Sequence, residues 1–273
     1  MANITNTQPK FSVAISSPGY QKLINDTLGD KEIARRFVAE ISTVVSQNPM
    51  LQKCEAASIL SAGLTAQTLN LPLAPTLGFS YVVPYGDKAQ FQIGYKGLVQ
   101  LAQRSGQFER IGVNLVHEGE YLGRDEFGDA KIVFDDKYAN EKVIGYCAYF
   151  RLLNGFKKTL YWTVEQCEQH GKKYSKSFNN LWKSSFDMMA QKTVLKLLLN
   201  RYAPLSIEMQ MAIRADQAVI NEDGSYSYVD NPNYVEEQPK GKKTTIKNTV
   251  EVDEETGEVN EFDSYIPADE ITE

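Results

Sequence analysis

Basic and aromatic side chains are interleaved along the stretch from Leu71 to Glu120. Lysine and arginine bind a phosphate backbone, and aromatic rings offer planes on which unpaired bases stack. Tyr95 stands beside Lys96 between two glycines and is the best aromatic candidate for such contact, whereas Phe91 alternates with polar neighbours as a core residue of a strand does. The stretch therefore predicts nucleic-acid binding through Tyr95 and four basic residues: Lys88, Lys96, Arg104 and Arg110.

A second basic region runs from Lys157 to Arg201, where nine basic residues face three acidic ones. Lys192 and Lys196 are four residues apart, so a helix would present both on one face. Any single lysine here is also explained as a solvated surface charge, and the prediction depends on the set. We expect this region to form the opposite wall of a groove and to close it, through Lys172, Lys173, Lys176, Asn179, Asn180, Lys192, Lys196 and Arg201.

Catalytic motifs are harder to find in this sequence. His117 and His170 have no second ligand at metal spacing, and no phosphate-binding loop, dinucleotide fingerprint or nucleophile elbow is present. Two acidic pairs, Asp135-Asp136 and Glu118-x-Glu120, have the chemistry to hold Mg²⁺, although such pairs are more often exposed loop charges. Two alternatives to a DNA-binding protein therefore stay open: a Mg²⁺-dependent nucleic-acid-processing enzyme, and a structural oligomer whose basic face is incidental.

The elements that position these residues follow from hydrophobic periodicity and turn signals. Gly86-Asp87-Lys88 splits two β-rich runs into a hairpin, which leads into a helix ending near Gly106. Asn154-Gly155 joins a second hairpin, and we expect about five or six strands in one sheet. Thr163 is expected to cap a short helix through His170, followed by a flexible basic joint. The expected strands are 79–85, 89–95, 111–116, 130–134, 143–153 and 158–164, and the other expected helices are 30–48, 52–69, 181–203 and 206–219.

Together these elements predict an α+β fold, with a central, mostly antiparallel sheet that includes a β-hairpin and is packed by helices. Residues 1–19 are polar and broken by prolines, so we expect a flexible N-terminal arm. Residues 20–220 carry the periodic apolar pattern of a DNA-binding and oligomerisation core. Residues 221–273 lose that pattern, and we expect a largely disordered acidic tail.

The net charge of −6 averages two opposed regions. Residues 1–203 hold 24 Lys and Arg against 18 Asp and Glu, while residues 204–273 hold 5 against 17. A basic body suggests a polyanionic partner, although acidic tails often serve only solubility. No apolar run approaches the roughly 20 residues of a membrane span. With no secretory signal and three scattered cysteines, Cys54, Cys147 and Cys167, we expect a cytoplasmic protein with reduced thiols.

Four motifs follow one another along the chain: Gly78-Phe79-Ser80-Tyr81-Val82-Val83-Pro84-Tyr85, Gln92-Ile93-Gly94-Tyr95-Lys96-Gly97-Leu98, Gln103-Arg104-Ser105-Gly106 and Glu118-Gly119-Glu120. Together they resemble the signature of the RecT family of phage single-strand annealing proteins, in particular those of Gram-positive prophages. The combination is specific, and a looser resemblance covers about residues 20–205.

The resemblance implies a phage-encoded protein of the bacterial cytoplasm that anneals complementary single strands in recombination without ATP. It also implies oligomeric rings or helical filaments, a partner exonuclease, a contact with the host single-strand binding protein, and a distant kinship of fold with Redβ. No cofactor would be required, with Mg²⁺ as a possible modulator. Annealing further demands that the protein hold the backbone and leave the base-pairing edges free, so binding should be sequence-independent and salt-sensitive.

Overall fold

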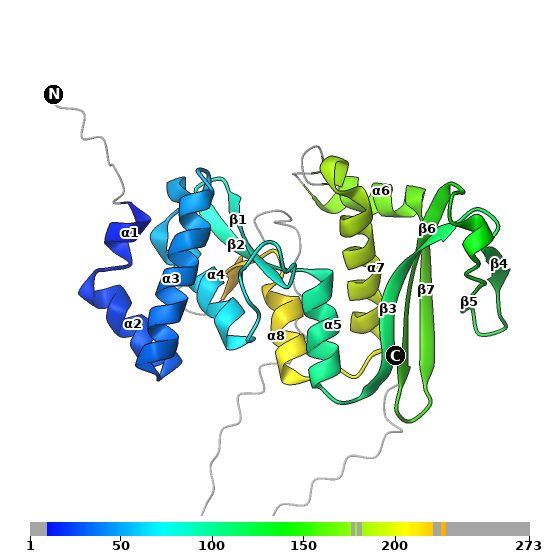
Figure 1. Cartoon of the computed structure of the whole chain (residues 1–273), viewed down its shortest axis with the longest axis horizontal. Helices are drawn as coiled ribbons and strands as arrows, with labels where there is room; N and C mark the ends of the chain where they lie inside the picture. The colour runs from blue at the N-terminus through cyan, green and yellow to red at the C-terminus, as the bar shows by residue number, and fades with distance from the viewer. Residues whose placement is uncertain (1–9, 176–177, 179–181, 221–224, 228–273) are drawn as a thin grey trace, which may run out of the picture. The chain divides into compact units, whose positions relative to one another are not determined.

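A computed structural model describes residues 10–175, 178, 182–220 and 225–227, and these form an α+β fold, as the sequence predicts. The amino-terminal part is helical (Figure 1). Its elements are α1 (Phe11–Ala14), α2 (Pro18–Leu28), α3 (Lys31–Gln47), η1 (Leu51–Lys53) and α4 (Ala56–Thr68).

Helix α3 begins where the sequence predicts. The Asp30 side chain accepts hydrogen bonds of 2.8 Å from the backbone amides of Glu32 and Ile33, as an N-cap residue does. Phe37 and Ile41 on the apolar stripe of this helix are buried against α4, where Gly63 leaves room for both side chains.

The expected flexible arm is not what the structure shows for residues 10–19. Phe11 of α1 and Ile15 are 6% and 2% exposed and belong to the main core cluster. Burial of these two side chains removes apolar surface from water and ties the segment to the helical layer. Residues 1–9 lie outside the described residues.

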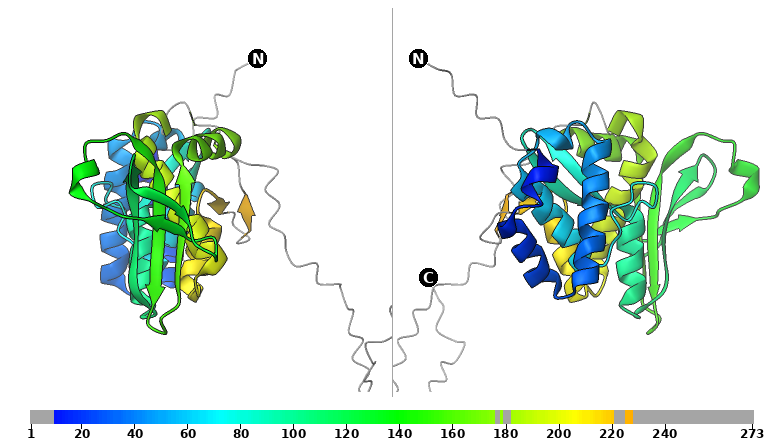
Figure 2. Two further views of the ribbon diagram at one scale, coloured as in Figure 1. Left: turned by 90° about the vertical axis from the view of Figure 1, so that its right-hand side faces the viewer. Right: turned by 60° about the vertical axis from the view of Figure 1, so that its left-hand side comes forward.

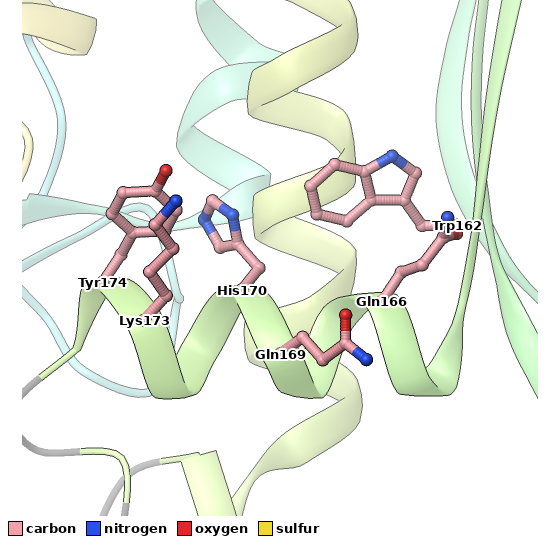
Figure 3. Close-up of a pocket in the computed structure, with 6 residues that line it drawn as sticks. All are labelled: Trp162, Gln166, Gln169, His170, Lys173 and Tyr174. Atoms are coloured by element: carbon pink, nitrogen blue, oxygen red, sulfur yellow. The ribbon is translucent and has the colours of Figure 1, made fainter.

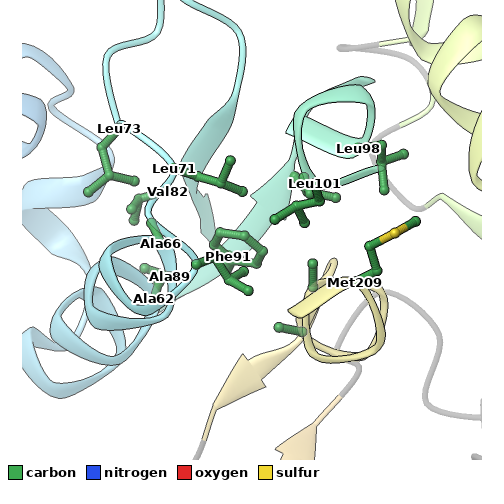
Figure 4. Packing of buried hydrophobic residues seen from close by; sticks show 14 of the residues in the cluster. Ala62, Ala66, Leu71, Leu73, Val82, Ala89, Phe91, Leu98, Leu101 and Met209 are labelled. Atoms are coloured by element: carbon green, nitrogen blue, oxygen red, sulfur yellow. The ribbon is translucent and has the colours of Figure 1, made fainter. Parts of the chain in front are cut away.

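The β-hairpin and its helix follow the prediction closely. Strands β1 (Ser80–Tyr85) and β2 (Lys88–Ile93) are antiparallel, and Gly86 adopts a φ of +61° in the turn between them. Helix α5 (Tyr95–Arg104) begins directly after β2. Phe91 of β2 is fully buried, which confirms its assignment to the core (Figure 4).

The larger sheet has three strands, so the expectation of one sheet with five or six strands is wrong. Strands β3 (Phe108–His117), β6 (Val143–Leu152) and β7 (Lys157–Thr163) are antiparallel, in the order β3-β6-β7. The hairpin β1-β2 forms a sheet of its own, and two further pairs are short. These are β4 (Tyr121–Arg124) with β5 (Ala130–Ile132), and β8 (Val219–Ile220) with β9 (Tyr226–Ser227).

The carboxyl-terminal helices are α6 (Val164–Tyr174), α7 (Phe186–Tyr202) and α8 (Ile207–Ala215). Helix α7 lies along one face of the three-stranded sheet (Figures 1 and 2), where the Tyr146 hydroxyl of β6 donates a 2.6 Å hydrogen bond to Asp187. Helix α6 continues to Tyr174, so residues 171–174 are helical and not the flexible joint that the glycine and lysines suggested. Helix α8 ends at Ala215, earlier than expected, because Gln217 has a positive φ of 67° and the chain turns into β8.

The core joins the hairpin to the helices around it. Figure 4 shows the side chain of Phe91 among residues of α4, α5 and α8. The labelled members of this cluster are Ala62, Ala66, Leu71, Leu73, Val82, Ala89, Phe91, Leu98, Leu101 and Met209. Among the described helices, none combines the length and apolar character needed to cross a membrane. Of the expected acidic tail 221–273, the structure describes only residues 225–227, in which Tyr226 pairs with Ile220.

Candidate nucleic-acid interface

The corner between β2 and α5 is built by backbone contact. The Gly94 amide donates a 2.9 Å hydrogen bond to the Phe79 carbonyl. A Cβ atom on Gly94 would overlap the carbonyl oxygen of Gly78, and one on Gly97 would overlap that of Phe79. Only glycine allows such an approach of two backbone segments, which explains why glycines flank Tyr95 and Lys96.

This corner brings Lys96 and two tyrosines together. A Cβ on Gly78 would lie 3.3 Å from the Tyr81 hydroxyl and 3.5 Å from Cδ of Lys96, so both side chains pack over Gly78. Burial raises the pKa of Tyr81, and the neighbouring Tyr95 adds to this effect. Lys96 itself is exposed. Of the predicted pair, Lys96 is therefore exposed, while Tyr95 is half-buried and packs against the core cluster.

A second group of rings lies on α6 and the end of β7. Thr163 caps α6 through a reciprocal pair of hydrogen bonds with Gln166, which fixes the start of the helix directly after Trp162. The His170 ring lies 5.4 Å from the Trp162 ring and 4.6 Å from the Tyr174 ring. These three rings line a surface depression of about 290 Å³ together with Gln166, Gln169 and Lys173 (Figure 3). We call it the α6 depression.

Lys173 carries the positive charge of the α6 depression, and the side-chain amide of the lining residue Gln169 donates a 3.1 Å hydrogen bond to Glu165. Burial, with a further contribution from the charges of Lys196 and Lys173, lowers the pKa of His170 to about 4, so the imidazole is neutral at pH 7. Lys173 lies 5.1 Å from the centre of the Tyr174 ring. The depression thus combines stacking planes and a lysine charge with two glutamine side chains, one of which accepts the Thr163 amide while the other donates to Glu165.

Lys192 and Lys196 are not the open wall of a groove that their spacing suggested. The Lys192 ammonium lies 2.8 Å and the Lys196 ammonium 2.6 Å from the two carboxylate oxygens of Asp216, which also accepts the Ile93 amide. Lys192 and Asp216 are 7% and 2% exposed. Burial alone would raise the pKa of Asp216, but the two lysine charges outweigh it and hold that pKa below its usual value.

This ion triad is an internal tie between α7, β2 and the end of α8. The charge of Lys192 is therefore used inside the fold and is not exposed at the surface. The side chain of Lys196 is 27% exposed, and its charge contributes to the lowered pKa of His170.

The remaining predicted residues are spread over the surface. Arg104 donates a 2.9 Å hydrogen bond to the Leu69 carbonyl, so it secures the end of α4. Lys88 is half-buried at the hairpin turn opposite Tyr85, and Arg201 is exposed in the last turn of α7. Arg110 lies on the three-stranded sheet, opposite Arg151.

Lys172 is exposed but pairs with Glu168 at 2.6 Å and does not line the α6 depression. Lys176, Asn179 and Asn180 lie outside the described residues. Sequence reasoning missed Trp162, His170 and Tyr174 as a group. The spacing of four residues between His170 and Tyr174, on a helix that starts directly after Trp162, is the signal that would have found them.

One member of each acidic pair considered for Mg²⁺ has a structural partner. Glu120 is buried and accepts a 2.6 Å hydrogen bond from the His117 amide, and Asp135 caps η2 (Asp136–Tyr138) and pairs with Lys137. Among the described residues, no group of three His, Cys, Asp or Glu side chains has the arrangement to hold a metal ion.

Comparison with known proteins agrees with the motif resemblance. The RecT family model matches residues 35–230. The uncharacterized protein YqaK of Bacillus subtilis strain 168 is 40% identical over 233 residues, which cover 85% of this chain and 81% of the relative. Protein RecT of Escherichia coli strain K12 is 30% identical over 239 residues, with 80% and 87% covered. This chain belongs to the RecT family.

Proposed function

We propose that this protein binds single-stranded DNA and anneals complementary strands in recombination without nucleotide hydrolysis. Membership of the RecT family and similarity to Protein RecT of Escherichia coli support this role. The proposal requires no cofactor, treats Mg²⁺ only as a modulator, and places no catalytic step on the protein.

The observation that carries the proposal is the α6 depression. Trp162, His170 and Tyr174 gather three rings on one side of α6, with Lys173 at the rim and the charge of Lys196 close behind His170. Stacking on aromatic side chains tolerates any base, because every base has a π face. Lysine contacts to phosphate are likewise independent of sequence. Such a site suits a protein that must bind many different strands.

Annealing adds the condition that bases remain able to pair. A ring that contacts the face of a base leaves its hydrogen-bonding edge free, whereas a closed pocket around the edge would block pairing. The α6 depression is shallow and open, and at the β2-α5 corner Lys96 is exposed beside the half-buried Tyr95. Both sites therefore suit holding a strand in a form that a complementary strand can reach.

One subunit of 30.7 kDa covers only a few nucleotides, so useful annealing requires subunits side by side on a strand. The proposal therefore includes a homo-oligomer on the DNA, in rings or filaments, and an annealed duplex as the product. A phage exonuclease and the host single-strand binding protein are the proposed protein partners, and residues 221–273 are the segment that we propose contacts them. Deleting 221–273 should abolish pull-down of both partners, and unchanged pull-down would contradict this assignment.

The binding experiment uses the intrinsic tryptophans. Trp182 is 3% exposed, so quenching of fluorescence by an oligothymidine should come from Trp162 and should disappear in Trp162→Phe. Tyr174→Ala should weaken binding by about five- to 150-fold, because loss of one stacking ring costs about 1–3 kcal/mol.

Lys173→Ala should also weaken binding and should lower the salt dependence by about 0.7 in the slope of log K against log salt, as expected for one phosphate contact to a single strand. Lys172→Ala is the matched comparison, since it removes the same charge from the adjacent position without touching the α6 depression. Equal effects of the two lysine substitutions, or quenching that persists in Trp162→Phe, would contradict this site.

A further inference from the structure

The three-stranded sheet has a face that points away from α7. Tyr146 and Phe150 of β6 face α7 and the core, so the alternating residues Tyr149 and Arg151 point to the opposite side. The part of this outer face around Tyr161 of β7 is covered by β4 and β5, and Tyr121 of β4 stacks on Tyr161 with ring centres 4.6 Å apart. The part next to the turn between β6 and β7 is exposed.

Three cations line up across this exposed part. In the register of the sheet, Arg110 of β3 lies opposite Arg151 of β6, and Arg151 lies opposite Lys157 of β7. Directly paired residues of antiparallel strands project to the same face, and all three side chains are exposed. We call these three residues the cationic row.

The cationic row does not help the sheet to fold. Like charges directly opposite each other in a sheet are destabilising. One carboxylate offsets part of the repulsion, because Glu109 lies 3.0 Å from the Arg151 guanidinium. The row with Glu109 still has a net charge of +2, and Arg110 and Lys157 are the two members outside that ion pair.

An aromatic ring lies beside the cationic row. A Cβ atom on Gly112 of β3 would lie 2.7 Å from the Tyr149 hydroxyl oxygen and 2.9 Å from the nearest ring carbon, so Tyr149 lies across the adjacent strand at Gly112. Neighbouring strands are about 4.8 Å apart, so the row spans roughly 10 Å. One strand of B-form DNA carries a phosphate about every 3.4 Å along the helix axis, so a row of this length can contact two or more neighbouring phosphates.

We propose that the cationic row and Tyr149 form a second nucleic-acid site, which binds the phosphate backbone of a second strand. The inference rests on the proposed annealing function and deepens it. Trp162 pairs with Tyr146 and faces the α7 side of the sheet, so the α6 depression and the cationic row lie on opposite faces. Binding of a second strand on the outer face raises its local concentration beside the first strand, which speeds encounter of complementary sequences.

The test uses Arg110→Gln/Lys157→Gln, which leaves the Arg151–Glu109 ion pair in place. The matched control is Arg35→Gln/Lys131→Gln, which removes two exposed cations from α3 and β5. Each protein is first saturated with one dye-labelled oligothymidine. A second oligothymidine with another dye is then added, and energy transfer between the dyes reports its capture.

Wild type and control should capture the second strand equally. In Arg110→Gln/Lys157→Gln, capture should weaken, with a salt slope lower by about 1.4 for two lost phosphate contacts, while binding of the first strand stays unchanged. Its melting temperature should be unchanged or higher, since like charges have been separated. Capture equal to the control would overturn the second site and leave the proposed function standing. Failure of wild type to bind even the first strand would overturn the proposed function.

Acetylation of lysines in wild type provides a second readout. Lys157 should react in the free protein and become protected when the second oligothymidine is added, while Lys131 should react in both states. Protection of Lys157 without DNA would mean that another copy of the chain covers the cationic row. Protection by an acidic peptide but not by oligothymidine would mean a protein ligand. Either result would overturn the inference.

Discussion

The Asp216→Asn variant should have a much lower free energy of unfolding than wild type. The folded variant should still bind DNA with unchanged affinity. Asparagine keeps an oxygen that can accept the Ile93 amide, so the substitution removes mainly the negative charge. Lys192 and Lys196 would then face each other in the interior without a counter-charge. The structure thus predicts that this triad acts on stability and not on the interface.

The size of the effect follows from burial. The side chain of Asp216 is 1% exposed and that of Lys192 is 9% exposed, so solvent screens their interaction weakly. Removing one partner of a buried ion pair costs about 3–5 kcal/mol. For a folded region of about 200 residues this corresponds to a fall of roughly 6–20 °C in Tm. Lys192→Met should cost less, because Asp216 keeps Lys196 as a partner at 2.6 Å.

The assay is urea unfolding at pH 7 together with oligothymidine binding at a temperature where both variants are folded. We expect the order wild type, Lys192→Met, Asp216→Asn in decreasing stability, with unchanged affinity for DNA. Lys173→Ala should show the reverse pattern of unchanged stability and weaker binding. Loss of DNA affinity in folded Lys192→Met, with stability intact, would refute the structural assignment of Lys192.

Three further predictions concern the supports of the site. Gly94→Ala should destabilise the folded protein by about 1–3 kcal/mol or more, because the added Cβ would overlap a backbone carbonyl. Gly19→Ala is the control and should not destabilise the protein, because the space around Gly19 is open. Thermal melting measures both variants. His170 has a pKa of about 4 in the folded protein against 6.5 in the unfolded chain, so its contribution to stability is complete above pH 6.5 and is lost as the pH falls towards 4. In His170→Gln, the free energy of unfolding in urea should therefore change less between pH 7 and 4.5 than in wild type. An unchanged pH dependence would count against the burial of this ring. Tyr146→Phe should cost about 1.5–3 kcal/mol in urea unfolding, because its hydroxyl donates 2.6 Å to a carboxylate on α7, and a loss below about 0.5 kcal/mol would contradict that bond.

Local signals predicted the hairpin and its helix well. Gly86 adopts the positive φ that a tight turn requires, and Asp30, where the predicted helix 30–48 begins, caps α3. These features depend on residues close together in the sequence. The way in which strands share sheets depends on contacts between distant segments, and the hairpin β1-β2 therefore turned out to be separate from β3-β6-β7.

The same limit explains the errors at the site. The spacing of Lys192 and Lys196 correctly placed them on one helical face. Nothing nearby in the sequence shows that Asp216, which is 24 and 20 residues away from these two lysines, closes over that face. Helix α7 is buried on several sides, and its buried residues include Val194 and Leu195. When a helix has apolar residues on most of its faces, a charged residue within it can be expected to lie inside the protein.

The central claim is tested most directly by annealing itself. Two complementary oligonucleotides with paired dyes are mixed with the protein at modest ionic strength, without nucleotide, and duplex formation is followed in time. The account predicts that wild type accelerates pairing and that Tyr174→Ala and Lys173→Ala lose most of this acceleration, while Lys172→Ala retains it. Pairing no faster with wild type than without protein would contradict the account.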